Sequence, residues 1–181
     1  VIAGCANQKE PATKALADAE SALASVREQA AEYVPDQLKG VESTLSSLKD
    51  SLGKGDFKAV LTAAPKLATD VASLKDAAGT AMSAAMEKAK GEWTQLASDL
   101  PNMVGAIESR VDVLGKSRRL PAGMSQASLD AAKTGLAEMK STWTEAGNAF
   151  TSGNVKDAVK MAQDLKAKGT EIMTALGMTT G

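Results

Sequence analysis

The sequence predicts an all-α protein, a helical bundle of six to eight helices built from two related three-helix units. Helix-favouring residues dominate the chain, and aromatic residues make up only 3% of it. Apolar residues recur at alternating spacings of three and four, which is the period of an amphipathic helix. The chain also matches itself when it is shifted by 98 residues. With 181 residues, 44% of them hydrophobic, it is long enough to bury a core.

The first helix is expected from about Pro11 to Tyr33, and Pro35 suits the first turn of the second. The Gly-Lys-Gly sequence at residues 53–55 is expected to close the second helix. Each helix carries one apolar stripe. The stripes are Leu16, Ala19, Leu23, Val26, Ala30 and Tyr33 in the first helix, and Leu38, Val41, Leu45, Leu48 and Leu52 in the second.

The third helix is expected to begin near Asp56, which is a suitable N-cap. Its apolar pattern continues well past Leu74. An unbroken helix over residues 56–99 would be about 65 Å long, which is long for a globular core. A break is therefore expected near Gly79 or Gly91.

A further helix is expected to open at Pro101 and to end at Gly115. It corresponds to the first helix at an offset of 88 residues, with Leu16 falling on Val104. The connection that follows it, residues 115–124, is ten residues longer than its counterpart.

Two helical hairpins correspond at the offset of 98 without a gap, and the loop glycine Gly55 falls on Gly153. Matching apolar positions include Leu38 with Leu136, Val41 with Met139, Leu45 with Trp143, Leu48 with Ala146, Leu52 with Phe150 and Leu74 with Ile172. Any two amphipathic helices can be aligned on their period. The matching loop positions and helix lengths nevertheless favour a duplication.

Charge and composition exclude several function classes. The 21 basic residues are balanced by 22 acidic ones, so no nucleic-acid partner is expected. Histidine is absent and cysteine occurs once, which removes the commonest catalytic base and most zinc sites. We therefore expect no catalytic residues, no metal, no cofactor and no enzyme activity. The basic run at residues 116–119 suits a helix C-terminus, and the alternative is a contact with a phosphate or a lipid headgroup.

The single cysteine lies at position 5, after Ile2, Ala3 and Gly4. This sequence resembles the lipobox of bacterial lipoproteins, with a free thiol as the alternative interpretation. The resemblance implies that Cys5 is the lipidation site and that several acyl chains anchor the protein to a membrane. Because Ala6 stands where an inner-membrane retention signal has Asp, it further implies a periplasmic location at the outer membrane.

These features together predict five segments. Residues 1–4 are expected to be a signal-peptide remnant and residues 5–13 a lipid-anchor tether. Residues 14–79 are expected to form the first helical unit, 80–100 a connecting helix and 101–178 the second helical unit.

All eight methionines and both tryptophans lie beyond residue 80. Methionine is flexible and fills irregular volumes, so this cluster either packs an ordinary core or lines a pocket for a rigid apolar ligand. Relative to the first copy, Val41, Leu45 and Leu52 are replaced by Met139, Trp143 and Phe150, which suggests divergence toward binding.

The whole chain is similar in character to the lipoprotein component of bacterial sterol transporters. That resemblance implies a carrier that takes up a sterol-like lipid for the outer membrane, beside other components of a lipid transport system. The ligand-binding residues it implies are Trp93, Met103, Met139, Trp143, Met161 and Met173. Alternatively, the hydroxyl of Tyr33 contacts the ligand. The alternative is a structural or adaptor lipoprotein that binds a protein partner.

Overall fold

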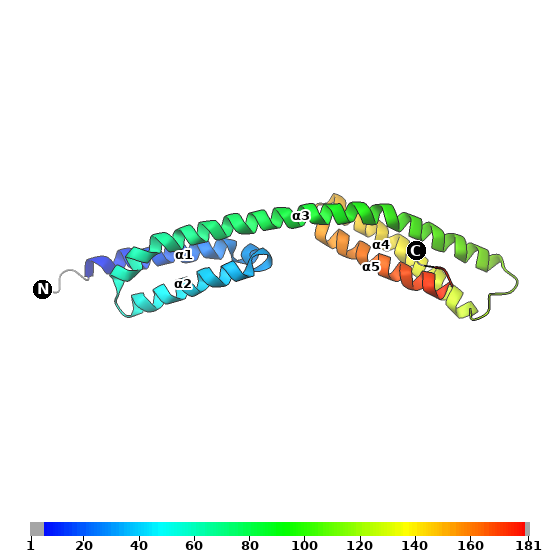
Figure 1. Cartoon of the computed structure of the whole chain (residues 1–181), viewed down its shortest axis with the longest axis horizontal. Coiled ribbons are helices and arrows are strands. Elements are labelled where there is room, and N and C mark those ends of the chain that lie inside the picture. Colours follow the sequence, from blue (N-terminus) through cyan, green and yellow to red (C-terminus); the bar gives the residue numbers. More distant parts are fainter. Residues whose placement is uncertain (1–5, 180–181) are drawn as a thin grey trace. The chain divides into compact units, whose positions relative to one another are not determined.

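The computed structural model describes residues 6–179, which form five α-helices and no strands. The helices are α1 (Ala6–Tyr33), α2 (Pro35–Gly53), α3 (Phe57–Lys116), α4 (Gln126–Thr151) and α5 (Val155–Ala175) (Figure 1). The all-α helical bundle is confirmed. The expected number of six to eight helices is wrong, because three of the expected helices are parts of α3.

Helix α3 runs without a break through Gly79, Gly91 and Pro101. The expected break at a glycine and the expected start of a helix at Pro101 are therefore wrong. A glycine inside a helix costs about 1 kcal/mol relative to alanine, which tertiary packing readily offsets. Packing is available on both sides of these glycines, since Ala78 and Trp93 are both buried.

The chain divides into two compact units, with the boundary between Ala85 and Met86. This boundary falls inside the segment 80–100 that was expected to connect the units. Helices α1 and α2 and the first part of α3 make unit 1. The rest of α3 with α4 and α5 makes unit 2.

Each unit has its own apolar core, to which three helical segments contribute. In unit 1 the core is mainly leucine, valine and alanine: Leu16, Leu23, Val26, Leu38, Leu45, Leu48, Val60, Leu67 and Leu74. In unit 2 the buried residues include Trp93, Leu100, Ile107, Leu129, Leu136, Met139, Leu165 and Leu176. Full burial of one such side chain contributes about 1.5–3 kcal/mol, so these stripes are what hold the helices together.

Helix α1 begins at Ala6, five residues before its expected start at Pro11. Ala12 is completely buried in the core of unit 1, so packing stabilises the first turns of the helix, before residue 13. The segment expected to be a tether is therefore helical from Ala6 onward. Cys5 and the signal-peptide remnant expected at residues 1–4 lie outside the described residues.

The local signals for the turns are confirmed. Pro35 lies in the first turn of α2, and Asp56 caps α3 by accepting a hydrogen bond from the Ala59 amide at 3.1 Å. Gly55 and Gly153 follow α2 and α4 with φ of +80° and +89°, a left-handed conformation in which a side chain is strained.

The two glycine turns share their hydrogen bonds at the 98-residue offset. Gly55 donates to the Leu52 carbonyl at 3.1 Å, as Gly153 does to Phe150 at 3.1 Å. The amides that follow each glycine, those of Asp56 and Asn154, donate to Ser51 and Ala149 at 2.9 Å each.

We predict opposite effects for two glycine substitutions. Gly153→Ala places a side chain in the left-handed region and lowers the free energy of unfolding by about 1–2 kcal/mol. Gly91→Ala fills open space on α3 and raises it by about 0.5–1 kcal/mol. Urea denaturation followed by circular dichroism measures both. Destabilisation by Gly91→Ala would contradict a continuous helix at that position.

Candidate functional site

All six residues expected to bind a ligand lie in unit 2. They come from each of its helical segments: Trp93 and Met103 from α3, Met139 and Trp143 from α4, and Met161 and Met173 from α5. Met139 is fully buried and Trp93 is 9% exposed. The other four are half-buried and pack against the same core. Tyr33, the alternative hydroxyl donor, is half-buried and lies in unit 1, so it is not part of the same unit as the six residues.

Three aromatic rings form a stack between α3 and α4. The Trp93 ring lies 5.2 Å from that of Trp143 and 4.7 Å from that of Phe150, centroid to centroid. The ring planes differ by only 15° and 9°. Trp143 and Phe150 are seven residues apart on one helix face, a rise of about 10.5 Å. That spacing holds one further ring, so Trp93 lies between the other two.

Methionine side chains surround a glycine where α5 meets α3 and α4. A Cβ atom added to Gly169 would contact Met103 Sδ closely and would lie 2.9 Å from Met139 Cε. A second close approach occurs at Gly135, where an added Cβ would lie 2.7 Å from Ile172 Cδ1. The two glycines let the helices approach closely, with the flexible methionines filling the remaining volume.

The ring stack includes Phe150, and the close helix approaches involve Gly135 and Gly169. None of these three was among the expected site residues. Phe150 carried a signal, because it replaces Leu52 in the alignment of the two copies. The sequence around Gly135 and Gly169 carried no such signal, because a glycine inside a helix has the same sequence pattern whether it is exposed or tightly packed. Gly91, for example, has open space around it.

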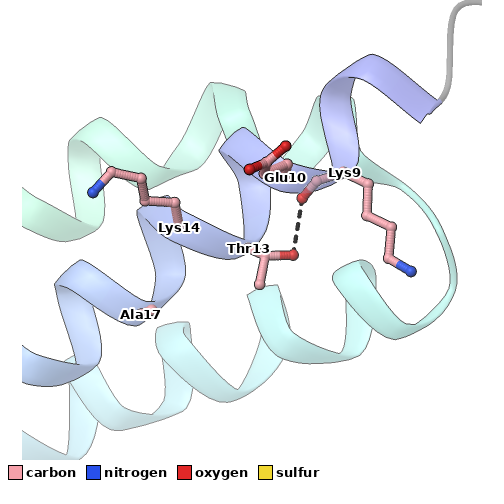
Figure 2. Close-up of a pocket in the computed structure, with 5 residues that line it drawn as sticks. All are labelled: Lys9, Glu10, Thr13, Lys14 and Ala17. Carbon is pink, nitrogen blue, oxygen red and sulfur yellow. Dashed lines mark hydrogen bonds between the residues drawn. The ribbon is translucent and has the colours of Figure 1, made fainter.

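Four hollows on the described part of the chain are lined by residues other than the six expected ones. The hollow in Figure 2 has a volume of about 410 Å³ and is lined by Lys9, Glu10, Thr13, Lys14 and Ala17 of α1. All five are exposed, and the Thr13 hydroxyl donates to the Lys9 carbonyl at 2.8 Å. Because the lining is exposed, a ligand there would remain largely in water. A binding pocket, in contrast, normally encloses most of its ligand.

Another hollow lies in unit 2. It has a volume of about 250 Å³ and is lined by Met86 and by residues 153–157, which follow Phe150 in the chain. Residues from α3, from the turn after α4 and from the start of α5 thus come together at this hollow.

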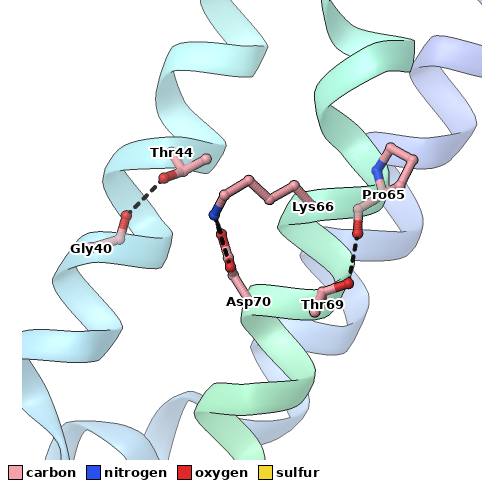
Figure 3. A network of polar contacts seen from close by, with 6 residues as sticks. All are labelled: Gly40, Thr44, Pro65, Lys66, Thr69 and Asp70. Carbon is pink, nitrogen blue, oxygen red and sulfur yellow. Dashed lines mark hydrogen bonds and ion pairs between the residues drawn. The ribbon is translucent and has the colours of Figure 1, made fainter.

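Polar side chains on the outer faces mostly interact within their own helix. In Figure 3, Lys66 donates to Asp70 at 2.7 Å, and the Thr69 hydroxyl donates to the Pro65 carbonyl at 3.0 Å. On α5, the hydrogen bond to Asp164 raises the pKa of the exposed Lys160. Pairs of this kind, four residues apart, support a solvated helix surface.

No group of three or more acidic or cysteine side chains among residues 6–179 is arranged to hold a metal ion. None of the helices over the same residues contains an apolar stretch of the length that spans a bilayer.

We also compared the chain with known proteins. No family model, no curated protein and no solved structure matches it significantly.

We predict that Gly169→Ala raises the free energy of unfolding by about 1 kcal/mol less than Gly147→Ala does, because the added methyl group must displace the ends of the Met103 and Met139 side chains. Gly147→Ala is the matched control, since it lies inside α4 with open space around it. Thermal denaturation measures both variants.

A double-mutant cycle tests the cause. If Met103 is the obstacle, Gly169→Ala is more favourable by at least about 0.5 kcal/mol in a Met103→Ala background than in the parent chain. Equal effects in both backgrounds would contradict the contact.

Proposed function

We propose that this chain is a periplasmic lipoprotein, anchored to the outer membrane through Cys5, that binds a hydrophobic ligand without catalysis. The ligand is rigid and sterol-like, and the protein takes it up for transport to the outer membrane beside other components of a lipid transport system. The observation that carries the proposal is the ring stack of Trp93, Trp143 and Phe150 in unit 2.

The comparison of the two units supports this choice of site. Their cores correspond at the 98-residue offset, with Leu38 and Leu136 buried alike and Leu67 and Leu165 buried alike. We infer from these matches and from the shared turn hydrogen bonds that the units are related copies. At the ring stack, however, the first copy has Leu45 and Leu52, which suffice to pack a core. The aromatic residues of unit 2 are then an addition to what folding requires.

The stack offers a planar binding surface for a planar ligand. The rings contact one another in this structure. A ligand can therefore insert between them only if α3 and α4 move apart and a ring face becomes exposed. Burial of its apolar surface contributes about 25 cal/mol per Å². Met139 and Met161 on α4 and α5 adapt to the new volume because methionine changes rotamer at low cost.

A second candidate is a structural or adaptor lipoprotein that binds a protein partner. The closed packing of Met139, which is fully buried, favours it. An adaptor uses its outer surface and needs no opening of the core.

The chain itself supplies a variant that separates these functions. Trp143→Leu combined with Phe150→Leu restores the residues of the first copy, Leu45 and Leu52. We predict that it lowers the affinity for dehydroergosterol at least about tenfold, because the planar contact surface is lost. Equilibrium titration of ligand fluorescence measures the affinity, and Leu45→Met in unit 1 is the control that leaves it unchanged.

The two tryptophans also report ligand entry directly. The stacked indoles couple in circular dichroism, and insertion of a ligand next to Trp93 reduces this signal in the parent chain. Trp143→Phe keeps a ring in the stack and retains part of the affinity. If the parent chain binds no sterol, the carrier function is excluded. If the double leucine variant binds sterol equally well, the ring stack is excluded as the binding site.

If no lipid binds and cross-linking in the periplasm captures protein partners, the adaptor function is supported instead.

A further inference from the structure

We propose that the loop between α3 and α4 docks on an anionic phospholipid surface through Arg118 and Arg119. This surface, termed the loop surface, consists of Val113 at the end of α3 together with Arg118, Arg119, Leu120 and Pro121. The proposal is independent of any ligand in the core of unit 2.

The two arginines differ from most cations of the chain. Lysines along the helices pair with carboxylates, as Lys140 does with Glu108 at 2.7 Å and Lys166 with Asp99 at 3.1 Å. Arg118 and Arg119 are exposed and have no ion pair or hydrogen bond to another described residue. They are therefore available to an external anion.

The helix dipole does not account for these two arginines. The cation in the last turn of α3 is Lys116, which also pairs with Asp112 at 3.3 Å. Arg118 and Arg119 follow the end of the helix, and the dipole effect is confined to the last turn. The first acidic residue of α4, Asp130, is already engaged by Lys133 at 3.3 Å.

The loop is held in place by apolar contacts with unit 2. Leu120 and Met124 are half-buried against the core, and the Met124 amide donates to the Pro121 carbonyl at 3.1 Å. The arginines between Leu114 and Leu120 are thus presented on a fixed segment. Unit 1 has only Val34 at the corresponding connection, so the loop is an addition to unit 2.

Val113 gives the loop surface its apolar part. It is 59% exposed, the most exposed of the large apolar side chains among the described residues. Its carbonyl accepts a hydrogen bond at 2.8 Å from the hydroxyl of Ser117, the residue that precedes Arg118. An exposed aliphatic residue one helical turn before two unpaired arginines suits the interface of an anionic membrane, where the cations meet lipid phosphates and the side chain enters the headgroup boundary. A soluble polyanion would offer Val113 no apolar surface.

Vesicle co-sedimentation tests the proposal, with Cys5→Ser in every variant so that no acyl anchor contributes. We predict binding to vesicles of phosphatidylcholine containing about a quarter phosphatidylglycerol, and little binding to phosphatidylcholine alone. Replacing both arginines by serine weakens binding about 30-fold, since each cation near an anionic surface contributes about fivefold. Val113→Asn weakens binding further by removing the apolar contact.

Unit 1 provides the matched control. Lys54 and Lys58 flank the turn between α2 and α3, are exposed and have no ion pair with described residues. Serine at both positions removes the same charge and is expected to change binding less than about twofold. Raising the ionic strength to about 0.5 M is expected to weaken binding of the parent chain.

Three results would overturn the proposal. An equal loss with the lysine control would indicate attraction by net charge alone. Equal binding to neutral vesicles would exclude a role for lipid phosphate. Equal and arginine-dependent binding of a single-stranded oligonucleotide would assign the loop to nucleic acid instead.

Discussion

Burial of the apolar face of α3 within each unit is the constraint on which the rest of the structure depends. Leu67 and Leu74 enter the core of unit 1, and Leu100 and Ile107 enter that of unit 2. Each of these side chains contributes about 1.5–3 kcal/mol on burial. An isolated helix is marginal in water and gains most of its stability from packing of its apolar face. Helix α3 is therefore as long as its partners on both sides require.

Each unit packs three helical segments around an apolar core, but the side chains that fill the two cores differ. Unit 1 uses leucine, valine and alanine, whose few rotamers give a well-defined core. Unit 2 places aromatic rings and flexible methionines at corresponding positions, and it uses Gly135 and Gly169 where helices approach most closely. A core made of thioethers and stacked rings can rearrange at lower cost than one of branched aliphatic residues. That difference, rather than any polar group, is what makes unit 2 the candidate for binding.

Polar chemistry is confined to the surface of the described residues and is largely local. No buried polar or charged residue is present there, and ion pairs on exposed helices contribute less than about 1 kcal/mol each. Long-range pairs such as Lys140 with Glu108 tie neighbouring helices within one unit. The loop surface differs from most of this surface because its two arginines have no ion pair with a described residue and follow the end of a helix next to the half-buried Leu120.

The sequence by itself determined the helical class, the apolar stripes, the cap at Asp56 and the glycine turn at Gly55. These features act within a few residues, so their causes are visible in a short stretch of chain. Only the tertiary structure decided that α3 continues through Gly91 and that Trp93 lies between Trp143 and Phe150. Both outcomes depend on side chains from other helices, which supply the burial that offsets a weak helix former and the second face of a ring contact. Local patterns can say which residues are apolar, but which of them meet is fixed only when the helices pack.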